Sequence, residues 1–192
     1  VYIHDFGLET ADGEAVDHTK IREAFHECFV RVWRGEVEND GFNRLVLSAG
    51  LGWRDVVVLR AYSKYLRQAS IPFSQDYMEE TLARNAGITR RLADLFTLRF
   101  DPDYKGDRDA DEKACIADIK ERLDKVENLD EDRIVRRFLN LIQSTLRTNF
   151  YQLGPDGGPK SYVSLKFDAR NIQELPAPAP LREIFVYSSR FE

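Results

Sequence analysis

The sequence has few of the residues that most often build disulfide or metal sites. Its 192 residues include two cysteines and three histidines. Cys28 and Cys115 lie far apart, and no Cys-x-x-Cys pair or other spacing typical of a metal site occurs. Long apolar runs are also lacking, and none reaches the roughly 18 residues of a membrane-spanning helix. These absences argue against a disulfide framework and a membrane protein, and they favour the reducing cytoplasm.

The sequence also lacks an excess of basic residues. Its 28 lysines and arginines stand against 33 acidic residues, which gives a net charge of −5. Proteins that bind nucleic acid or anionic membranes usually carry the opposite charge, so neither partner is expected. Hydrophobic residues make up 43% of the chain. That is enough for the core of one good-sized domain, or of one domain plus a piece of another.

Apolar residues recur at helical spacing through most of residues 17–153. This pattern predicts six or seven helices, with strands only near the two ends of the chain. The β-branched run 56–59 would also suit a strand. The apolar pattern continues to Tyr65, however, and this length favours a helix at the centre of the bundle. The last predicted helix carries apolar positions within residues 134–146.

Capping residues and prolines predict where several helices begin and end. Asp17 is predicted to cap the first helix, which ends near Arg34. Ser74 is predicted to cap a later helix that reaches Asn85. A helix is predicted over Ile88–Phe100, and Asp101-Pro102 ends it, because the residue before a proline is biased away from helical geometry.

Three stretches read as short strands. They are residues 1–6, 162–168 and 183–188, and the last follows a proline-rich linker that cannot be helical. The predicted fold class is therefore mainly α: a bundle of six or seven helices with a short N-terminal strand and two C-terminal strands, α+β only at the edges. Either these strands pair with one another, or their sheet lies beyond Glu192.

Seven residues on the apolar faces of the proposed helices are predicted to form the core. They are Trp33, Phe42, Val57, Leu66, Phe96, Phe138 and Ile142. Phe138 shares its face with Ile134 and Leu141 at helical spacing, and it is therefore the most informative position to test.

No group of residues makes a complete active site. Of the three histidines, His4, His18 and His26, the last two are about two helical turns apart, too far to share one metal. The glycine-rich loop 154–159 lacks the Lys-Ser/Thr ending of a phosphate loop and does not lead from a strand into a helix. The acidic stretch 107–112 lacks the central glycine of a calcium loop and is typical of a helix N-terminus. We therefore predict no catalytic, cofactor-binding or metal-ligating residue.

Two further features are interpreted as structural. Cys28 lies beside an apolar helix stripe, where a buried thiol is usually inert. The pairs Arg90-Arg91 and Arg136-Arg137 fall on predicted helices. Such short basic pairs are typical of helix surfaces or of contacts with a neighbouring domain.

A long ordered match carries the most information. Within residues 32–62 the chain reads Val32-Trp33-Arg34-Gly35, Asn39-Asp40-Gly41-Phe42 and Gly50-Leu51-Gly52-Trp53-Arg54-Asp55. Residues 71–75, 95–102, 162–168 and 183–188 follow in the same order. Together these stretches resemble the helical segment just ahead of, and entering, the catalytic core of the large bacterial NAD-specific glutamate dehydrogenases. The resemblance covers nearly the whole chain.

The resemblance implies an enzyme that converts L-glutamate, water and NAD+ to 2-oxoglutarate, ammonium and NADH. It implies NAD as cofactor of the parent, none in this fragment, and a parent that is a homo-oligomer. It divides the chain into residues 1–16, the tail of an upstream ACT-like domain, residues 17–153, a helical domain, and residues 154–192, the start of the glutamate-binding domain sheet. Because the chain opens on Val1 and stops shortly after a strand, we expect an excised piece of a longer protein.

Two functions of different classes remain open. The first is a non-catalytic structural or regulatory segment of such a dehydrogenase, inactive alone, whose partners are the remaining domains of the parent. The second is an independent helical protein-interaction module whose two strands add to a partner's sheet. A monomeric chain with both strands paired internally would favour the second.

Overall fold

The computed structural model describes residues 18–189, which form seven α-helices and one three-stranded sheet. The helices are α1 (His18–Trp33), α2 (Leu45–Ser48), α3 (Trp53–Gln68), α4 (Gln75–Arg84), α5 (Ala86–Phe100), α6 (Arg108–Leu123) and α7 (Leu129–Ser144), with 3₁₀ turns η1 (Gly41–Arg44) and η2 (Ala169–Asn171). The strands are β1 (Thr145–Thr148), β2 (Tyr162–Phe167) and β3 (Glu183–Ser188). The predicted fold class, mainly α with a few strands, is confirmed.

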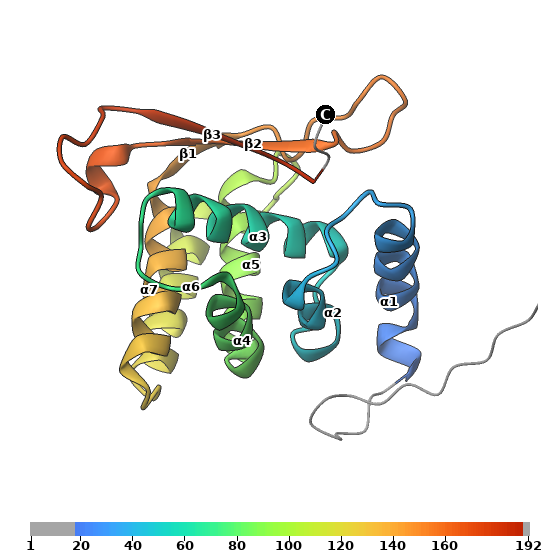
Figure 1. Cartoon of the computed structure of the whole chain (residues 1–192), viewed down its shortest axis with the longest axis horizontal. Coiled ribbons are helices and arrows are strands. Elements are labelled where there is room, and N and C mark those ends of the chain that lie inside the picture. The colour runs from blue at the N-terminus through green and yellow to red at the C-terminus, as the bar shows by residue number, and fades with distance from the viewer. Residues whose placement is uncertain (1–17, 190–192) are drawn as a thin grey trace, which may run out of the picture.

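Helix α3 occupies the centre of the arrangement. Figure 1 shows it lying across one end of helices α4–α7, between them and the sheet, while α1 stands at the opposite side from α7. Val56, Val58 and Leu59 of α3 are almost completely buried. The run 56–59 is thus helical and central, as its length predicted. No helix within residues 18–189 is long and apolar enough to cross a membrane.

Side-chain caps explain where several helices begin. The Ser74 hydroxyl accepts a hydrogen bond from the Tyr77 backbone N–H at 3.2 Å, which confirms it as the cap of α4. Asn128 caps α7 in the same way, by accepting from the N–H groups of Asp130 and Glu131. The predicted cap of the first helix, Asp17, and the predicted strand over residues 1–6 lie outside the described residues.

The end of α7 differs from the prediction. The last helix was predicted to carry apolar positions as far as Leu146, but α7 ends at Ser144 and β1 begins at the next residue. Thr145 pairs with Phe167 of β2, and the register shifts between Thr145 and Arg147, where a bulge lies. Pairing with β2 outweighs the helical periodicity, because the β-branched Thr145 and Thr148 suit a strand.

The two predicted C-terminal strands are confirmed, and they pair with each other. β2 and β3 are antiparallel, with Val163 opposite Tyr187 and Leu165 opposite Phe185. Val163, Leu165 and Phe167 point to the buried face, as the alternation predicted. The sheet order is β1-β2-β3, so β3 forms one of its edges.

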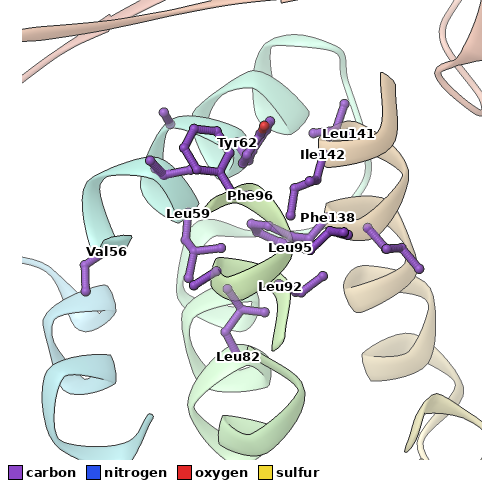
Figure 2. Packing of buried hydrophobic residues seen from close by; sticks show 14 of the residues in the cluster. Val56, Leu59, Tyr62, Leu82, Leu92, Leu95, Phe96, Phe138, Leu141 and Ile142 are labelled. Atoms are coloured by element: carbon purple, nitrogen blue, oxygen red, sulfur yellow. The ribbon is translucent and has the colours of Figure 1, made fainter. Parts of the chain in front are cut away.

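Five of the seven predicted core residues are fully buried, namely Phe42, Leu66, Phe96, Phe138 and Ile142, and several of them meet in Figure 2. Val57 is half-buried. Trp33 was predicted wrongly, because 82% of it is exposed. It lies in the last turn of α1, where its ring stacks on the half-exposed Phe29 at 6.1 Å rather than entering the bundle.

Truncation of Phe138 tests this packing. Phe138 is completely buried and lies near Leu95 and Ile142 in Figure 2, so Phe138→Ala leaves a cavity that α7 cannot close. We expect a loss of about 3–5 kcal/mol in the free energy of unfolding, measured by denaturant titration. Phe29→Ala, on the exposed stripe of α1, is the matched control, and its loss stays below about 1 kcal/mol. Equal losses for the two variants would contradict the burial described.

Candidate functional site

The residues weighed from sequence lie apart from one another. His26 is exposed, Cys28 and Cys115 are buried free thiols, and burial raises the pKa of both thiols. His4 lies outside the described residues, and the side chain of His18 does too. Within the described part of the chain, no group of three or more His, Cys, Asp or Glu residues could hold a metal ion.

The two loop-like motifs have structural roles. The glycine-rich residues 154–159 close a loop between β1 and β2, in which the Gly154 N–H donates to the Gly158 carbonyl at 2.7 Å. Gly157 has a φ of +74°, a conformation that favours glycine. In the acidic stretch, Asp107 caps α6 by accepting from the Ala110 N–H at 3.1 Å.

The arginine pairs form ion pairs within the chain. Arg91 bridges Asp94 of its own helix and Asp118 of α6, at 3.0 and 2.8 Å. Arg137 is buried, donates to the Gln173 carbonyl at 2.7 Å and pairs with Glu174. It therefore ties the segment after β2 to α7, a contact within the chain rather than with a separate domain.

Arg60, which sequence reasoning missed, is a fully buried arginine paired with Asp40. Its side chain on α3 is 0% exposed, and its Nε and Nη2 each donate to the Asp40 carboxylate at 2.7 Å. Nη2 also donates to the Asn43 side-chain oxygen at 2.8 Å. Burial alone would lower the pKa of Arg60, but the hydrogen bond and charge of Asp40 raise it above its ordinary value.

A signal for this network was present in the sequence. Arg60 follows directly on the apolar run 56–59 and precedes Ala61 and Tyr62, on a helix predicted to lie at the centre of the bundle. A charged residue in that setting needs a partner, because an unpaired buried charge is very costly. Its partner Asp40 lies in a loop, and periodicity does not predict such long-range pairs.

The network continues from Asp40 to α4. Gln75 donates to Asp40 at 3.4 Å and to Glu79 at 2.7 Å, and Glu79 also accepts from the Gly41 N–H at 3.0 Å. Burial raises the pKa of Glu79 despite these two donors. A Cβ on residue 41 would collide with the Glu79 carboxylate, so glycine is required there by close approach.

Three tyrosines tie the helices to the sheet. Tyr62 bonds the Thr145 hydroxyl at 2.9 Å, Tyr65 donates to Glu183 of β3 at 2.7 Å, and Tyr187 of β3 donates to Glu38 at 3.0 Å. Burial raises the pKa of all three phenols well above its ordinary value, so each keeps its proton. We call these tyrosines and the Arg60 network the helix–sheet junction.

Aromatic packing completes the helix–sheet junction. The Tyr65 ring lies 4.5 Å from that of Phe167 and 5.5 Å from that of Phe185, between β2 and β3. The opposite face of the sheet differs: Ile184 and Val186 of β3 are 64% and 57% exposed. The sheet thus has one face fixed on α3, and on its outer face the exposed Ile184 and Val186 of β3 lie opposite Lys166 and Ser164 of β2.

Comparison with known proteins gives two family matches. A family described as glutamate dehydrogenase, helical motif 3, matches residues 37–102. A second, described as bacterial NAD-glutamate dehydrogenase, catalytic domain, matches residues 118–192. The second match begins inside α6 and includes α7 and the whole sheet.

Curated relatives match the chain along its length. NAD-specific glutamate dehydrogenases of Halomonas elongata and Pseudomonas aeruginosa are 44% and 46% identical over 100% of the chain, and one of Mycobacterium tuberculosis is 45% identical over 88% of it. The chain spans only 10–12% of the length of these relatives. No solved structure matches it.

Removal of the buried charge tests the helix–sheet junction. Arg60→Met leaves Asp40 without its bidentate partner, and we expect a loss of about 3–5 kcal/mol in the free energy of unfolding. Lys125→Met removes one member of the exposed Lys125–Glu121 pair and is the matched control, with no measurable loss expected. An Arg60→Met protein as stable as the wild type would show that the desolvation of this pair cancels its attraction.

The pH dependence of stability tests the environment of Glu79. Because burial raises its pKa in the folded state, ionisation of Glu79 costs stability as pH rises through that folded pKa. Glu79→Gln removes this cost, so its free energy of unfolding relative to wild type increases between about pH 4 and pH 7. Glu121→Gln is the matched control for removal of one negative charge. A difference that falls as pH rises would contradict the assignment.

Proposed function

The chain belongs to the bacterial NAD-specific glutamate dehydrogenase family, and on this premise we propose that it is a non-catalytic segment that builds and positions the first strands of the glutamate-binding domain. The reaction of the parent would be oxidation of L-glutamate with NAD+ and water to 2-oxoglutarate, ammonium and NADH. The residues that bind NAD and glutamate would lie outside this segment. Its partners would be the remaining domains of the parent, itself a homo-oligomer.

The observation that carries the proposal is the direct passage of α7 into β1. Ser144 is the last residue of the helix and Thr145 the first of the strand, so no linker separates them. The Thr145 hydroxyl donates to the Leu141 carbonyl at 2.7 Å and therefore accepts from Tyr62. The sheet is thus held by α7 at one end and by α3 across its inner face, which supports a role in positioning it.

The outer face of the sheet supports the same role. An antiparallel sheet with one solvated face usually places polar residues there. β3 instead exposes Ile184 and Val186, and it lies at a sheet edge. Exposed apolar side chains at a sheet edge are normally covered by further elements. Since the relatives are far longer than the chain, we propose that the rest of the parent's glutamate-binding domain covers them.

The polar groups of the helix–sheet junction support a non-catalytic role. Hydride transfer requires a site that binds the nicotinamide and holds the substrate against it. At the junction, Arg60, Glu79 and Tyr65 already bond to Asp40, Gly41 and Glu183. Their arrangement suits a fixed connection between helices and sheet better than it suits a ligand.

The domain division remains a proposal with one adjustment. Residues 1–16 would be the tail of an upstream ACT-like domain and residues 17–153 the helical domain, followed by the catalytic sheet from residue 154. Because β1 pairs with β2, we place the beginning of the sheet unit at Thr145 instead. We also propose a cytoplasmic setting, which suits the buried free thiols of Cys28 and Cys115.

The second candidate, an independent interaction module, is favoured by one observation. β2 and β3 pair with each other, and internal pairing of these two strands was expected for an independent module. The match to a small part of much longer relatives favours the dehydrogenase segment. A chain that is also monomeric in solution would favour the interaction module.

An activity assay tests the proposed function. We expect no NADH formation from glutamate by the 192-residue chain, activity in the full-length parent, and none in a parent lacking residues 162–188. In the parent, Ile184→Asp with Val186→Asp should abolish most activity, because two charges then face the covering elements. In the 192-residue chain the same pair of changes should leave the helical circular dichroism unchanged, since both side chains are exposed.

A matched variant distinguishes this effect from surface charge alone. Leu153→Asp changes an exposed apolar residue in the loop before β2, away from the outer sheet face, and should leave parent activity unchanged. Turnover by the 192-residue chain, or full activity of the parent lacking residues 162–188, would contradict the proposal.

A further inference from the structure

The outer face of the sheet carries two adjacent cations. Arg147 of β1 lies directly opposite Lys166 of β2, which in turn lies opposite Ile184 of β3. Directly opposite residues of antiparallel strands point to the same face, so these three side chains form one row across the sheet. Since the neighbouring Leu165 and Phe167 are buried against the helices, the row points away from them. Figure 1 shows the helices gathered on the other side of the sheet.

Neither cation has a partner of opposite charge in the described part of the chain. Within residues 18–189, Arg147 and Lys166 form no ion pair and no side-chain hydrogen bond. Asp168, directly after β2, is the carboxylate closest to Lys166 in the sequence, but it already pairs with Arg170 at 3.1 Å and with Arg182 at 2.8 Å. The hydrogen bond and charge of Arg170, together with the charge of Arg182, hold the pKa of Asp168 below its usual range. Asp168 therefore does not neutralise Lys166.

The carboxylate of β3 at this end of the sheet faces inward. Glu183 is the first residue of β3, and it accepts from the Tyr65 hydroxyl of α3 at 2.7 Å. The outer row is thus left with two positive charges, and like charges directly opposite each other destabilise a pair of strands. A negative charge placed over Arg147 and Lys166 would relieve this repulsion.

The neighbours of the two cations are apolar, and they decide which kind of anion fits. Ile184 is 64% exposed beside Lys166, and Val186 is 57% exposed two residues further along β3. A phosphate or another small anion would neutralise the cations but leave both apolar side chains in water. A protein segment that carries a carboxylate next to apolar side chains matches the charge and the apolar surface together.

We propose that an acidic and apolar segment of the parent chain covers the outer sheet face, with a carboxylate paired to Arg147 and Lys166 and apolar side chains packed on Ile184 and Val186. This inference rests on the proposed function, in which the rest of the parent covers this face. Enough chain exists for such a segment, because this chain spans only 12% of its Halomonas relative. The two cations add that the cover is negatively charged, which Ile184 and Val186 alone do not require.

Reversal of one charge tests the proposal, because it should act in opposite directions in the chain and in the parent. In the 192-residue chain, Lys166→Glu places a carboxylate opposite Arg147, so the midpoint of thermal unfolding should rise by about 1–4 °C. In the full-length parent the same change sets two carboxylates against each other, so the temperature at which half of the NADH-forming activity is lost should fall.

A second variant at the same position is the matched control. Lys166→Met removes the charge without reversing it, and it should lie between wild type and Lys166→Glu in both proteins. A rise in both proteins would overturn the proposal, because no carboxylate would then face residue 166. A fall in both would overturn it too, because Lys166 would then be stabilised within the chain itself.

Carbodiimide coupling identifies the partner directly. This reagent joins a lysine amine to a carboxylate in contact with it, and mass spectrometry of the digest locates the bond. In the parent we expect Lys166 to be coupled to an aspartate or glutamate outside residues 1–192. Lys125, whose Nζ lies 3.0 Å from a Glu121 carboxylate oxygen, is the positive control and should be coupled to Glu121 in both proteins.

The acetylation rate of Lys166 separates failure of this proposal from failure of the proposed function. If the outer face is covered, acetylation should be roughly tenfold slower in the parent than in the 192-residue chain. Slow acetylation without coupling to a carboxylate would overturn the acidic partner and leave the cover in place. Equal rates would overturn the cover itself. Coupling of Lys166 to a second copy of the same segment would overturn the proposal in favour of self-association.

Discussion

Arg60 brings a cation to the central helix α3, and its charge must be neutralised inside the core. Asp40 does this through two hydrogen bonds of 2.7 Å, and in doing so it fixes the loop that leads into η1 and α2. The same loop carries Gly41, which meets Glu79 of α4, and Glu38, which meets Tyr187 of β3. One buried charge thus sets the relative positions of α3, α4 and the sheet.

The position of the sheet depends on this arrangement, because the sheet is too small to be stable alone. Three strands are few for an independent sheet, and here the inner face packs on aromatic residues of α3. Tyr65 packs between Phe167 and Phe185 while its hydroxyl reaches Glu183. Under the proposed function, the first strands of the next domain would then enter the larger enzyme already ordered and oriented.

Much of the helical part could be predicted from the sequence, because it depends on local rules. The cap at Ser74 and the burial of Phe138 follow from a capping hydroxyl and from apolar spacing. Alternation likewise predicted β2 and β3. A short strand such as β1 could not be predicted, because its four residues continue a helical pattern and only the pairing with β2 decides their conformation.

Burial and charge pairing were harder to predict than secondary structure. Trp33 and Phe138 occupy comparable apolar helix positions, yet only Phe138 is covered, because periodicity identifies a face and not what packs against it. The Arg60–Asp40 pair depends on two segments brought together by the fold. That the chain carries no catalytic, cofactor-binding or metal-ligating residue stays a prediction. The helix–sheet junction was missed because none of its members forms a local motif.

The direct connection of α7 to β1, from Ser144 to Thr145, also limits where the chain can gain or lose residues. We call this connection the α7–β1 seam. One added residue rotates a helix by about 100° and turns a strand over by 180°, so an insertion near Thr145 would misdirect both elements at once. Neither element could absorb it, since Thr145 is bonded to Leu141 on one side and to Tyr62 on the other. The loop 154–159, by contrast, belongs to neither a helix nor a strand. Insertions and deletions among relatives should therefore accumulate in that loop and stay out of the seam.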